Sequence, residues 1–240
     1  MPLIIPNSLR LGPTGSSSAP ASLSAFLTSI GKASWYANWL ASLGLDSLST
    51  GLGGAVASGG VVGRWSPLEQ VGFNYNFIQA TSANRPTYDA TICSDGVPAI
   101  YGNGSSWSLS LDSTTALNRD FTILISAETL NASNSYLFSK GGDQWSYYTN
   151  SIGNGIPYYA STTLIADQQI KALSDGLSTP GTHRIRKFAM SSGTSTGHYG
   201  NALRLLMHNA AYFAFHRIRG LALVPKLTAN ECSQALQYLP

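Results

Sequence analysis

Short stretches in which apolar and polar residues alternate run through most of the chain, separated by clusters of Gly, Asn, Pro and Asp. In the clearest, Phe121, Ile123, Ile125 and Ala127 occupy every second position. Because successive residues of a β-strand point to opposite faces of a sheet, this alternation predicts strands with one apolar face. Comparable stretches are 61–65, 107–111, 136–139, 145–149, 156–160, 183–190, 202–207 and 213–224. So many short strands predict an all-β chain, folded as an antiparallel sandwich of two packed sheets.

The length and the low content of charged residues indicate the number of domains and the state of assembly. A chain of 240 residues fits one sizeable domain. Charged residues make up 10% of the chain, against roughly 25% in average globular proteins. Since a weakly charged surface is poor at repelling copies of itself, we expect a homo-oligomer or a larger assembly.

Positive charge is concentrated late in the chain, where residues 183–187 and 216–219 both contain the string His-Arg-Ile-Arg. A patch that binds nucleic acid is one interpretation of these two strings. Both fall in expected strands, however, and alternate residues of a strand share a face. We therefore favour two strands with a polar face, and predict no nucleic-acid partner.

Residues 1–20 contain four prolines and a Gly/Ser-rich run, which excludes a regular helix or an interior strand. This segment is predicted to be an arm. Its apolar residues Leu3, Ile4 and Ile5 are the expected contacts with a partner, with a disordered terminus as the alternative. The start lacks the pattern of a signal peptide, and no stretch reaches the ~20 apolar residues of a membrane span, so we expect synthesis in a cytoplasm and no membrane association.

Helices are expected near both ends of the chain. From Ser22 to Ile30 apolar residues recur at helical spacing, and residues 35–43 either continue this helical series or already enter the first strand. Near the C-terminus, Thr228 and Glu231 have the spacing of a capping box, and Leu227 can contact Cys232 as a hydrophobic staple. We divide the chain into residues 1–34, an arm with a short helix that attaches to a partner, and residues 35–240, the sandwich.

Three segments together resemble the opening of a known kind of domain: Val61-Val62-Gly63-Arg64-Trp65, the string from Phe77 to Tyr88, and Gly96-Val97-Pro98-Ala99-Ile100. They are similar to concanavalin A-like lectin/glucanase domains related to laminin G modules. Phe121-Thr122-Ile123, Leu137-Phe138-Ser139 and the end of the chain from Ile218 continue the likeness. The resemblance covers roughly residues 35–239 and implies a jelly-roll sandwich.

Domains of this kind are common in bacterial surface proteins and in bacteriophage virion proteins. The resemblance, the arm and the absence of a secretion signal favour a non-catalytic virion structural protein, located in the head as decoration or fibre, or in the tail. Its expected partners are other virion proteins, contacted through the arm, and a glycan of the host surface. Threefold assembly is expected by analogy with other displayed virion proteins. A free or cell-surface bacterial lectin is the alternative.

A sugar site needs aromatic platforms beside amide or carboxylate groups, because a sugar presents an apolar face ringed by hydroxyls. The candidate residues for such a site are Asp143, Trp145, Tyr147, Tyr148 and Tyr158. Alternating aromatic residues in strands are more often part of a core, which is the competing interpretation.

Catalysis, cofactors and metals are not expected. The same fold includes glycoside hydrolases, which need two facing carboxylates, and the scattered acids of this chain form no such array. Cys93 and Cys232 are too far apart in sequence for a metal-type motif. The Gly-rich residues 51–63 lack the Gly-Lys-Ser/Thr of a phosphate loop and are interpreted as a flexible connection.

Overall fold

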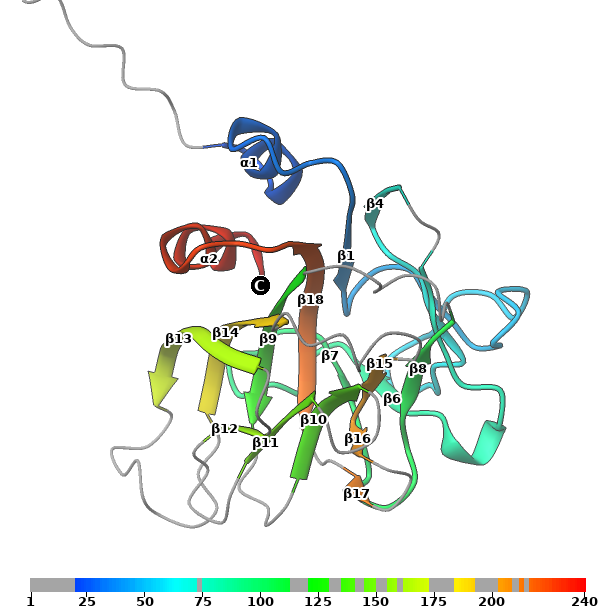
Figure 1. Ribbon diagram of the computed structural model, residues 1–240. Coiled ribbons are helices and arrows are strands. Elements are labelled where there is room, and N and C mark those ends of the chain that lie inside the picture. The colour runs from blue at the N-terminus through cyan, green and yellow to red at the C-terminus, as the bar shows by residue number, and fades with distance from the viewer. Residues whose placement is uncertain are drawn as a thin grey trace, which may run out of the picture.

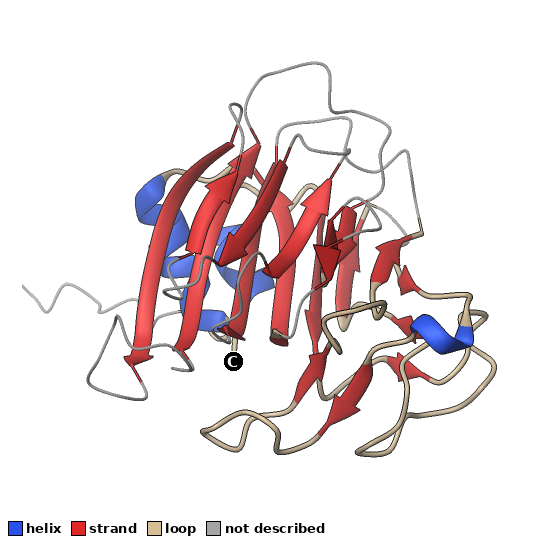
Figure 2. Cartoon of the chain, turned by 90° about the horizontal axis from the view of Figure 1, so that it is seen from below, coloured by secondary structure: helices blue, strands red, loops and turns tan. Residues whose placement is uncertain are grey.

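Two antiparallel sheets make up most of the regular structure, with short helices near both ends of the described chain (Figure 1, Figure 2). The all-β prediction is confirmed at this level, including the short C-terminal helix. The computed structural model describes residues 20–72, 75–112, 121–129, 135–140, 145–149, 155–158, 162–172, 184–192, 203–208, 212–213 and 216–240.

The first sheet is built around β9 (Phe121–Thr129) and β18 (Arg217–Pro225), which pair along most of their length. Its strand order is β13-β14-β9-β18-β1-β4, and β7 joins the same edge of β18 as β1 and carries β6. The other strands of this sheet are β13 (Thr162–Ala172), β14 (Arg184–Ser192), β1 (Tyr36–Leu40), β4 (Glu69–Val71), β7 (Ala99–Tyr101) and β6 (Thr87–Asp89).

The second sheet has the order β12-β11-β10-β15-β8-β5-β3-β2. Its strands are β12 (Gly155–Tyr158), β11 (Trp145–Thr149), β10 (Ser135–Lys140), β15 (Leu203–Leu205), β8 (Leu109–Leu111), β5 (Phe77–Ile78), β3 (Arg64–Trp65) and β2 (Leu45–Asp46). A separate hairpin pairs β16 (Met207–His208) with β17 (Tyr212–Phe213). Of the long strands, β13 was not predicted from the sequence.

The two sheets share one apolar core. Side chains of the first sheet such as Trp39, Ile125 and Leu223 belong to the same buried cluster as Phe77 and Leu109 of the second. The rings of Trp39 and Phe77 meet edge to face, with their centroids 5.1 Å apart. Because every second residue of 121–127 faces this core, the alternation that predicted a strand here is explained.

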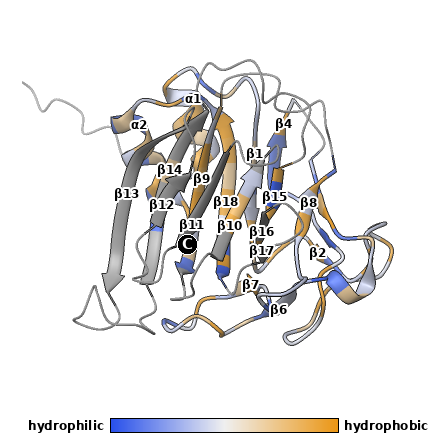
Figure 3. Ribbon diagram, turned by 60° about the horizontal axis from the view of Figure 1, so that its bottom comes forward, coloured by the Kyte–Doolittle hydropathy of each residue, from blue (hydrophilic) through white to orange (hydrophobic). Residues whose placement is uncertain are grey.

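The opposite face of the first sheet is covered by helices, so β9 and β18 are buried on both sides and β18 is largely hydrophobic in Figure 3. The helices are α1 (Leu23–Ser29), α2 (Ala229–Ala235) and the 3₁₀ helix η4 (Leu236–Tyr238), and Figure 1 shows α1 and α2 on one side of the sheet. We call the apolar residues between helices and sheet the outer cluster: Leu23, Phe26, Leu27, Tyr36, Leu124, Ala189, Ala222, Val224, Leu227, Cys232, Ala235, Leu236 and Leu239.

Both predicted helix starts are confirmed. Ser22 caps α1 and accepts a hydrogen bond from the backbone N–H of Ala25 at 3.2 Å. Thr228 and Glu231 form the full capping box at the start of α2. Among the helices of the described residues, none is long and apolar enough to cross a membrane.

The helical interpretation of residues 35–43 is wrong, and its alternative is right, because residues 36–40 form β1. Gly31, with φ of 69°, lies just past the end of α1 and separates the helix from the strand. Strand β1 lies between β18 and β4 and is buried on both faces, with Tyr36 in the outer cluster and Trp39 in the core. Burial on both faces places apolar residues on each side of such a strand, which hides the alternation that would identify it.

Candidate functional site

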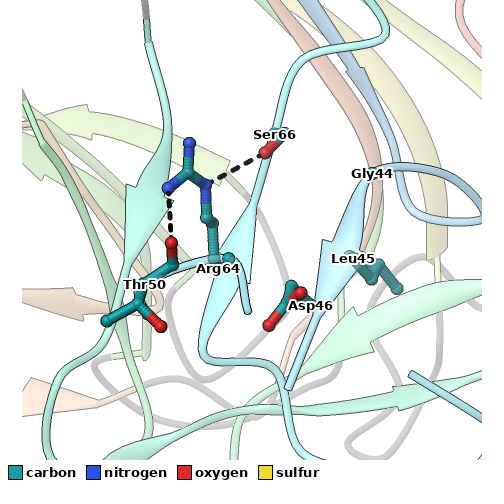
Figure 4. A pocket seen from close by; sticks show the side chains of 7 residues that line it. Gly44, Leu45, Asp46, Thr50, Arg64 and Ser66 are labelled. Atoms are coloured by element: carbon teal, nitrogen blue, oxygen red, sulfur yellow. Dashed lines mark hydrogen bonds between the residues drawn. The ribbon is translucent and has the colours of Figure 1, made fainter. Parts of the chain in front are cut away.

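A pocket of about 360 Å³ opens at the edge of the second sheet, where β2 and β3 pair (Figure 4). It combines an acid, a guanidinium, two hydroxyl side chains and bare glycine backbone. Its lining residues are Gly44, Leu45, Asp46, Thr50, Gly51, Arg64 and Ser66.

Strand pairing places the charged residues of the pocket. In the antiparallel register of β2 and β3, Asp46 lies directly opposite Arg64, one position from the pair Leu45 and Trp65. The Trp65 side chain is fully buried in the core. Packing of Trp65 in the core thus holds β3 in place, and with it the neighbouring Arg64 at the edge of the second sheet.

Asp46 organises the loop that follows β2. Its Oδ1 accepts hydrogen bonds from the backbone N–H groups of Leu48 at 2.7 Å and Gly53 at 3.0 Å, and its Oδ2 accepts one from Gly54 at 3.0 Å. Side chains of Asp commonly bind nearby backbone N–H groups in this way and so stabilise turns. Residues 47–54 are therefore folded around the carboxylate and form one wall of the pocket, although the sequence was interpreted as a flexible connection from residue 51 onward.

Arg64 forms the opposite wall. Its Nε donates to Oγ of Ser66 at 3.2 Å, and its Nη1 donates to the carbonyl oxygen of Thr50 at 3.3 Å. In Figure 4 the guanidinium points away from the carboxylate of Asp46, and Nη2 has no dashed contact to the residues drawn. Within the described part of the chain, Arg64 has no ion-pair partner.

Two glycines leave room for these side chains. Gly44 and Gly51 have φ of 72° and 80°, in the left-handed region that favours glycine. A Cβ on Gly44 would lie 2.3 Å from the carbonyl oxygen of Ser66, and one on Gly51 would lie 3.2 Å from Nη1 of Arg64. The pocket keeps its present shape only with glycine at both positions.

Among the described residues that line the pocket, Asp46 is the one carboxylate, whereas glycoside hydrolysis uses two that face each other. Searching the described residues also finds no group of three or more His, Cys, Asp and Glu side chains that could hold a metal ion.

A second concentration of polar groups, which we call the polar cluster, consists of Cys93, Asp95, Glu128, Arg217 and Arg219. The Glu128 side chain is fully buried; its Oε1 lies 3.0 Å from Nη1 of Arg217, and its Oε2 accepts the backbone N–H of Ser94 at 2.9 Å. Arg219 is 5% exposed and pairs with Asp95 at 3.0 Å. The cluster ties residues 93–95 to the first sheet.

This cluster corrects the interpretation of residues 216–219 as the polar face of a strand. The register of β9 and β18 shifts between Ile218 and Gly220, so the residue between them, Arg219, is extra. Arg217 lies opposite Glu128 in the register and pairs with it, and Arg219 pairs with Asp95. Since the Arg217 guanidinium is half-buried, that of Arg219 is buried, and each is paired with an acid, these two residues do not form a basic surface patch.

The Cys93 thiol in the polar cluster is unsuited to nucleophilic chemistry. Burial, followed by the charge of Glu128, raises the pKa of Cys93 to about 12. The thiolate is the reactive form of cysteine, so the protonated side chain is inert at neutral pH. Burial likewise raises the pKa of Cys232 to about 11, in agreement with its place in the outer cluster.

The predicted sugar-binding residues lie at the far edge of the second sheet from the pocket, on β11 and β12. Trp145 and Tyr147 occupy alternate positions of β11, and Tyr148 is the next residue. Tyr158 of β12 pairs with position 146 of β11. Asp143 lies outside the described residues, so the joint site stays a prediction.

The predicted attachment residues Leu3, Ile4 and Ile5 also lie outside the described residues. The pocket, in turn, was missed by the sequence analysis. Two features of the sequence could have pointed to it. Asp46 is followed by Gly53-Gly54, a combination typical of a turn, and Arg64 begins a short strand.

Comparisons of the chain with protein-family models, with curated proteins and with solved structures gave no match.

Proposed function

We propose that the protein is a non-catalytic structural component of a bacteriophage particle, in the head or the tail. Residues before α1 attach it to other particle proteins, and the β domain is displayed outward, where it adheres to a glycan of the host surface. The sequence resemblance to lectin-like jelly-roll domains of virion proteins supports this assignment, as does the low content of charged residues.

The packing of α1 is the observation that carries the proposal. Leu23, Phe26 and Leu27 are buried in the outer cluster against the first sheet. Beyond the helix, Nζ of Lys32 lies 2.8 Å from Oε2 of Glu231 and donates to the carbonyl oxygen of Lys226 at 2.7 Å. The segment that follows the arm is thus fixed to the sheet and to α2, and a partner that holds the arm also sets the position of the β domain.

The hydrogen bonds of Glu128 and Asp46 within the protein also support a non-catalytic role. Glu128 is hydrogen-bonded to Arg217 and Ser94, and Asp46 to three backbone N–H groups. A general acid or base must exchange a proton with a substrate, which requires a carboxyl group that can reach it. Glu128 is fully buried and does not meet that requirement.

Deleting residues 1–19 tests the attachment. The deleted chain keeps Ser22 and α1, so we expect its circular dichroism and thermal unfolding to match those of the full chain. In particles assembled from the genome that encodes it, the deleted chain should be absent or strongly depleted. A triple variant with Leu3, Ile4 and Ile5 replaced by Ser should behave in the same way.

Leu52→Ser is the matched control, because Leu52 is an apolar residue outside the arm that is 86% exposed. This variant should enter particles normally. Normal incorporation of the deleted chain would refute the attachment role, and secretion of the full chain without particles would favour the free lectin. Sedimentation equilibrium of the full chain tests the predicted homo-oligomer, with a trimer as the expected form.

A further inference from the structure

We propose that the pocket between β2 and β3 binds an acidic sugar of the uronic acid class, with the sugar carboxylate on Arg64. The proposal rests on the glycan adhesion proposed above and assigns it to a site other than the predicted aromatic one. Three features of the pocket carry it: a cation with no ion-pair partner among the described residues, a carboxylate that can accept a further hydrogen bond, and walls of glycine backbone.

The cation selects a negatively charged ligand. Nε and Nη1 of Arg64 are held by Ser66 and Thr50, which fixes the plane of the guanidinium. No acid among the described residues pairs with it. A guanidinium with free N–H groups is well matched to a carboxylate, because its planar donors can make charge-assisted hydrogen bonds.

The carboxylate of Asp46 restricts the ligand to one that carries hydroxyl groups and a single negative charge. Its Oδ2 accepts one hydrogen bond, from Gly54, and a carboxylate oxygen has room for a second donor. A sugar hydroxyl can donate there, and the charge of Asp46 repels a phosphate dianion more strongly than it repels a carboxylate monoanion in the same pocket. A ligand with one carboxylate and several hydroxyls can place its carboxylate on Arg64 and donate a hydroxyl hydrogen bond to Asp46.

The size and lining of the pocket favour an acidic over a neutral sugar. Its volume of about 360 Å³ is at the small end of ligand pockets and suits one sugar unit. The described residues of the lining include no aromatic ring on which a neutral sugar could stack. Binding should therefore depend on the ion pair with Arg64, and the glycines at 44 and 51 allow the ring to approach the backbone closely.

Isothermal titration of the full chain with D-glucuronate and D-galacturonate tests the proposal, with D-glucose and acetate as comparison ligands. At least one uronate should bind, and glucose and acetate should each bind at least tenfold more weakly. Arg64→Ala should weaken uronate binding at least tenfold, and Arg64→Lys should weaken it less. Near-UV circular dichroism checks that each variant is folded.

Arg204→Ala is the matched control, because Arg204 lies on β15 of the same sheet, separated from β3 by β8 and β5. This variant should bind uronates as the parent does. Uronate binding that survives Arg64→Ala, equal binding of glucose or of acetate, or no uronate binding would each overturn the proposal. These measurements use the isolated chain, so they do not depend on whether the protein enters particles.

Discussion

Nη1 of Arg217 lies 3.0 Å from Oε1 of Glu128, a carboxylate that is fully buried where β9 and β18 pair. Removing one partner of a buried ion pair destabilises a fold. The remaining charge has lost its hydration and no longer has an attractive interaction that compensates for that loss. This pair therefore adds to the pairing of β18 with β9, and the same carboxylate holds Ser94 to the first sheet.

Glu128→Gln should lower the free energy of unfolding by about 3 kcal/mol, since it leaves Arg217 without its counter-charge while keeping the side-chain volume. Urea unfolding followed by tryptophan fluorescence measures this change. Asp112→Asn is the control, because Asp112 is exposed and the substitution should change stability by no more than about 0.5 kcal/mol. Equal effects of the two substitutions would contradict the role given to the buried pair.

The two cysteines should make the protein less stable at alkaline pH. Burial, followed by neighbouring acid charges, raises the pKa of Cys93 from 9.0 to about 12 and that of Cys232 from 9.0 to about 11. A group with a raised folded-state pKa contributes its stability fully below the unfolded value and loses it as pH rises toward the folded value. Stability should therefore fall between pH 9 and about 12.

Urea midpoints at pH 8 and pH 10 measure this fall, and the double variant Cys93→Ala, Cys232→Ala separates it from the titration of lysines and tyrosines. The parent should lose more stability than the double variant over this interval. In the folded parent at pH 8, a thiol reagent should label neither cysteine, and it should label both after unfolding. An equal alkaline loss in both proteins would count against the raised pKa values.

Lys32→Ala should loosen α1 and cost roughly 0.5–1 kcal/mol at neutral pH, since Lys32 and Glu231 are only partly buried. Burial alone would raise the pKa of Glu231, but hydrogen bonds from Lys32 and Thr228 outweigh it and lower the pKa below 4.5. A depressed folded-state pKa gives stability that is present above the unfolded value and lost as pH falls through the folded value.

The parent should consequently lose its stability advantage over Lys32→Ala as pH falls below 4.5. Thermal unfolding at pH 7 and pH 3 tests this expectation. Lys32→Arg keeps the positive charge, so at pH 7 it should be nearly as stable as the parent. A gap between parent and Lys32→Ala that is constant across this range would show that the Lys32–Glu231 pair does not hold the helix.

Gly44→Ala should destabilise the fold more than Gly54→Ala. Both glycines have left-handed φ, 72° and 82°, so both substitutions cost about 1 kcal/mol in backbone strain. Only the Cβ at position 44 also meets another atom, 2.3 Å from the carbonyl oxygen of Ser66, while nothing lies within 4 Å of the one at position 54. Chemical unfolding of the two variants compares them directly, and equal losses would show that the close approach of the two segments is not rigid.

Features that depend on neighbouring residues could be predicted from the sequence. The alternation of 121–127 and the capping box of Thr228 and Glu231 are both confirmed, because each follows from geometry within a few residues. The helical interpretation of residues 35–43 failed for a related reason. Burial of β1 on both faces depends on helices and strands distant in sequence, and it removes the alternation.

The candidate site could not be predicted in this way, because the pocket exists only once β2 and β3 are in register. Asp46 and Arg64 are separated by the Gly-rich loop, and their placement across one strand pair is fixed by the burial of Trp65 in a core that both sheets build. The predicted sugar-binding residues that the structure describes lie on β11 and β12, at the opposite edge of the same sheet.

The sequence by itself determined the all-β class, strands such as 121–127, the starts of the helices and the low content of charged residues, since these depend on local periodicity and composition. Only the tertiary structure decided which polar residues are buried. Arg217 and Arg219 belong to a string that looks like an exposed basic face, yet the pairing of β18 with β9 places Arg217 beside Glu128, and residues 93–95 place Asp95 beside Arg219. Burial of a charge is favourable only next to its partner, and that partner comes from a part of the chain that sequence spacing does not reveal.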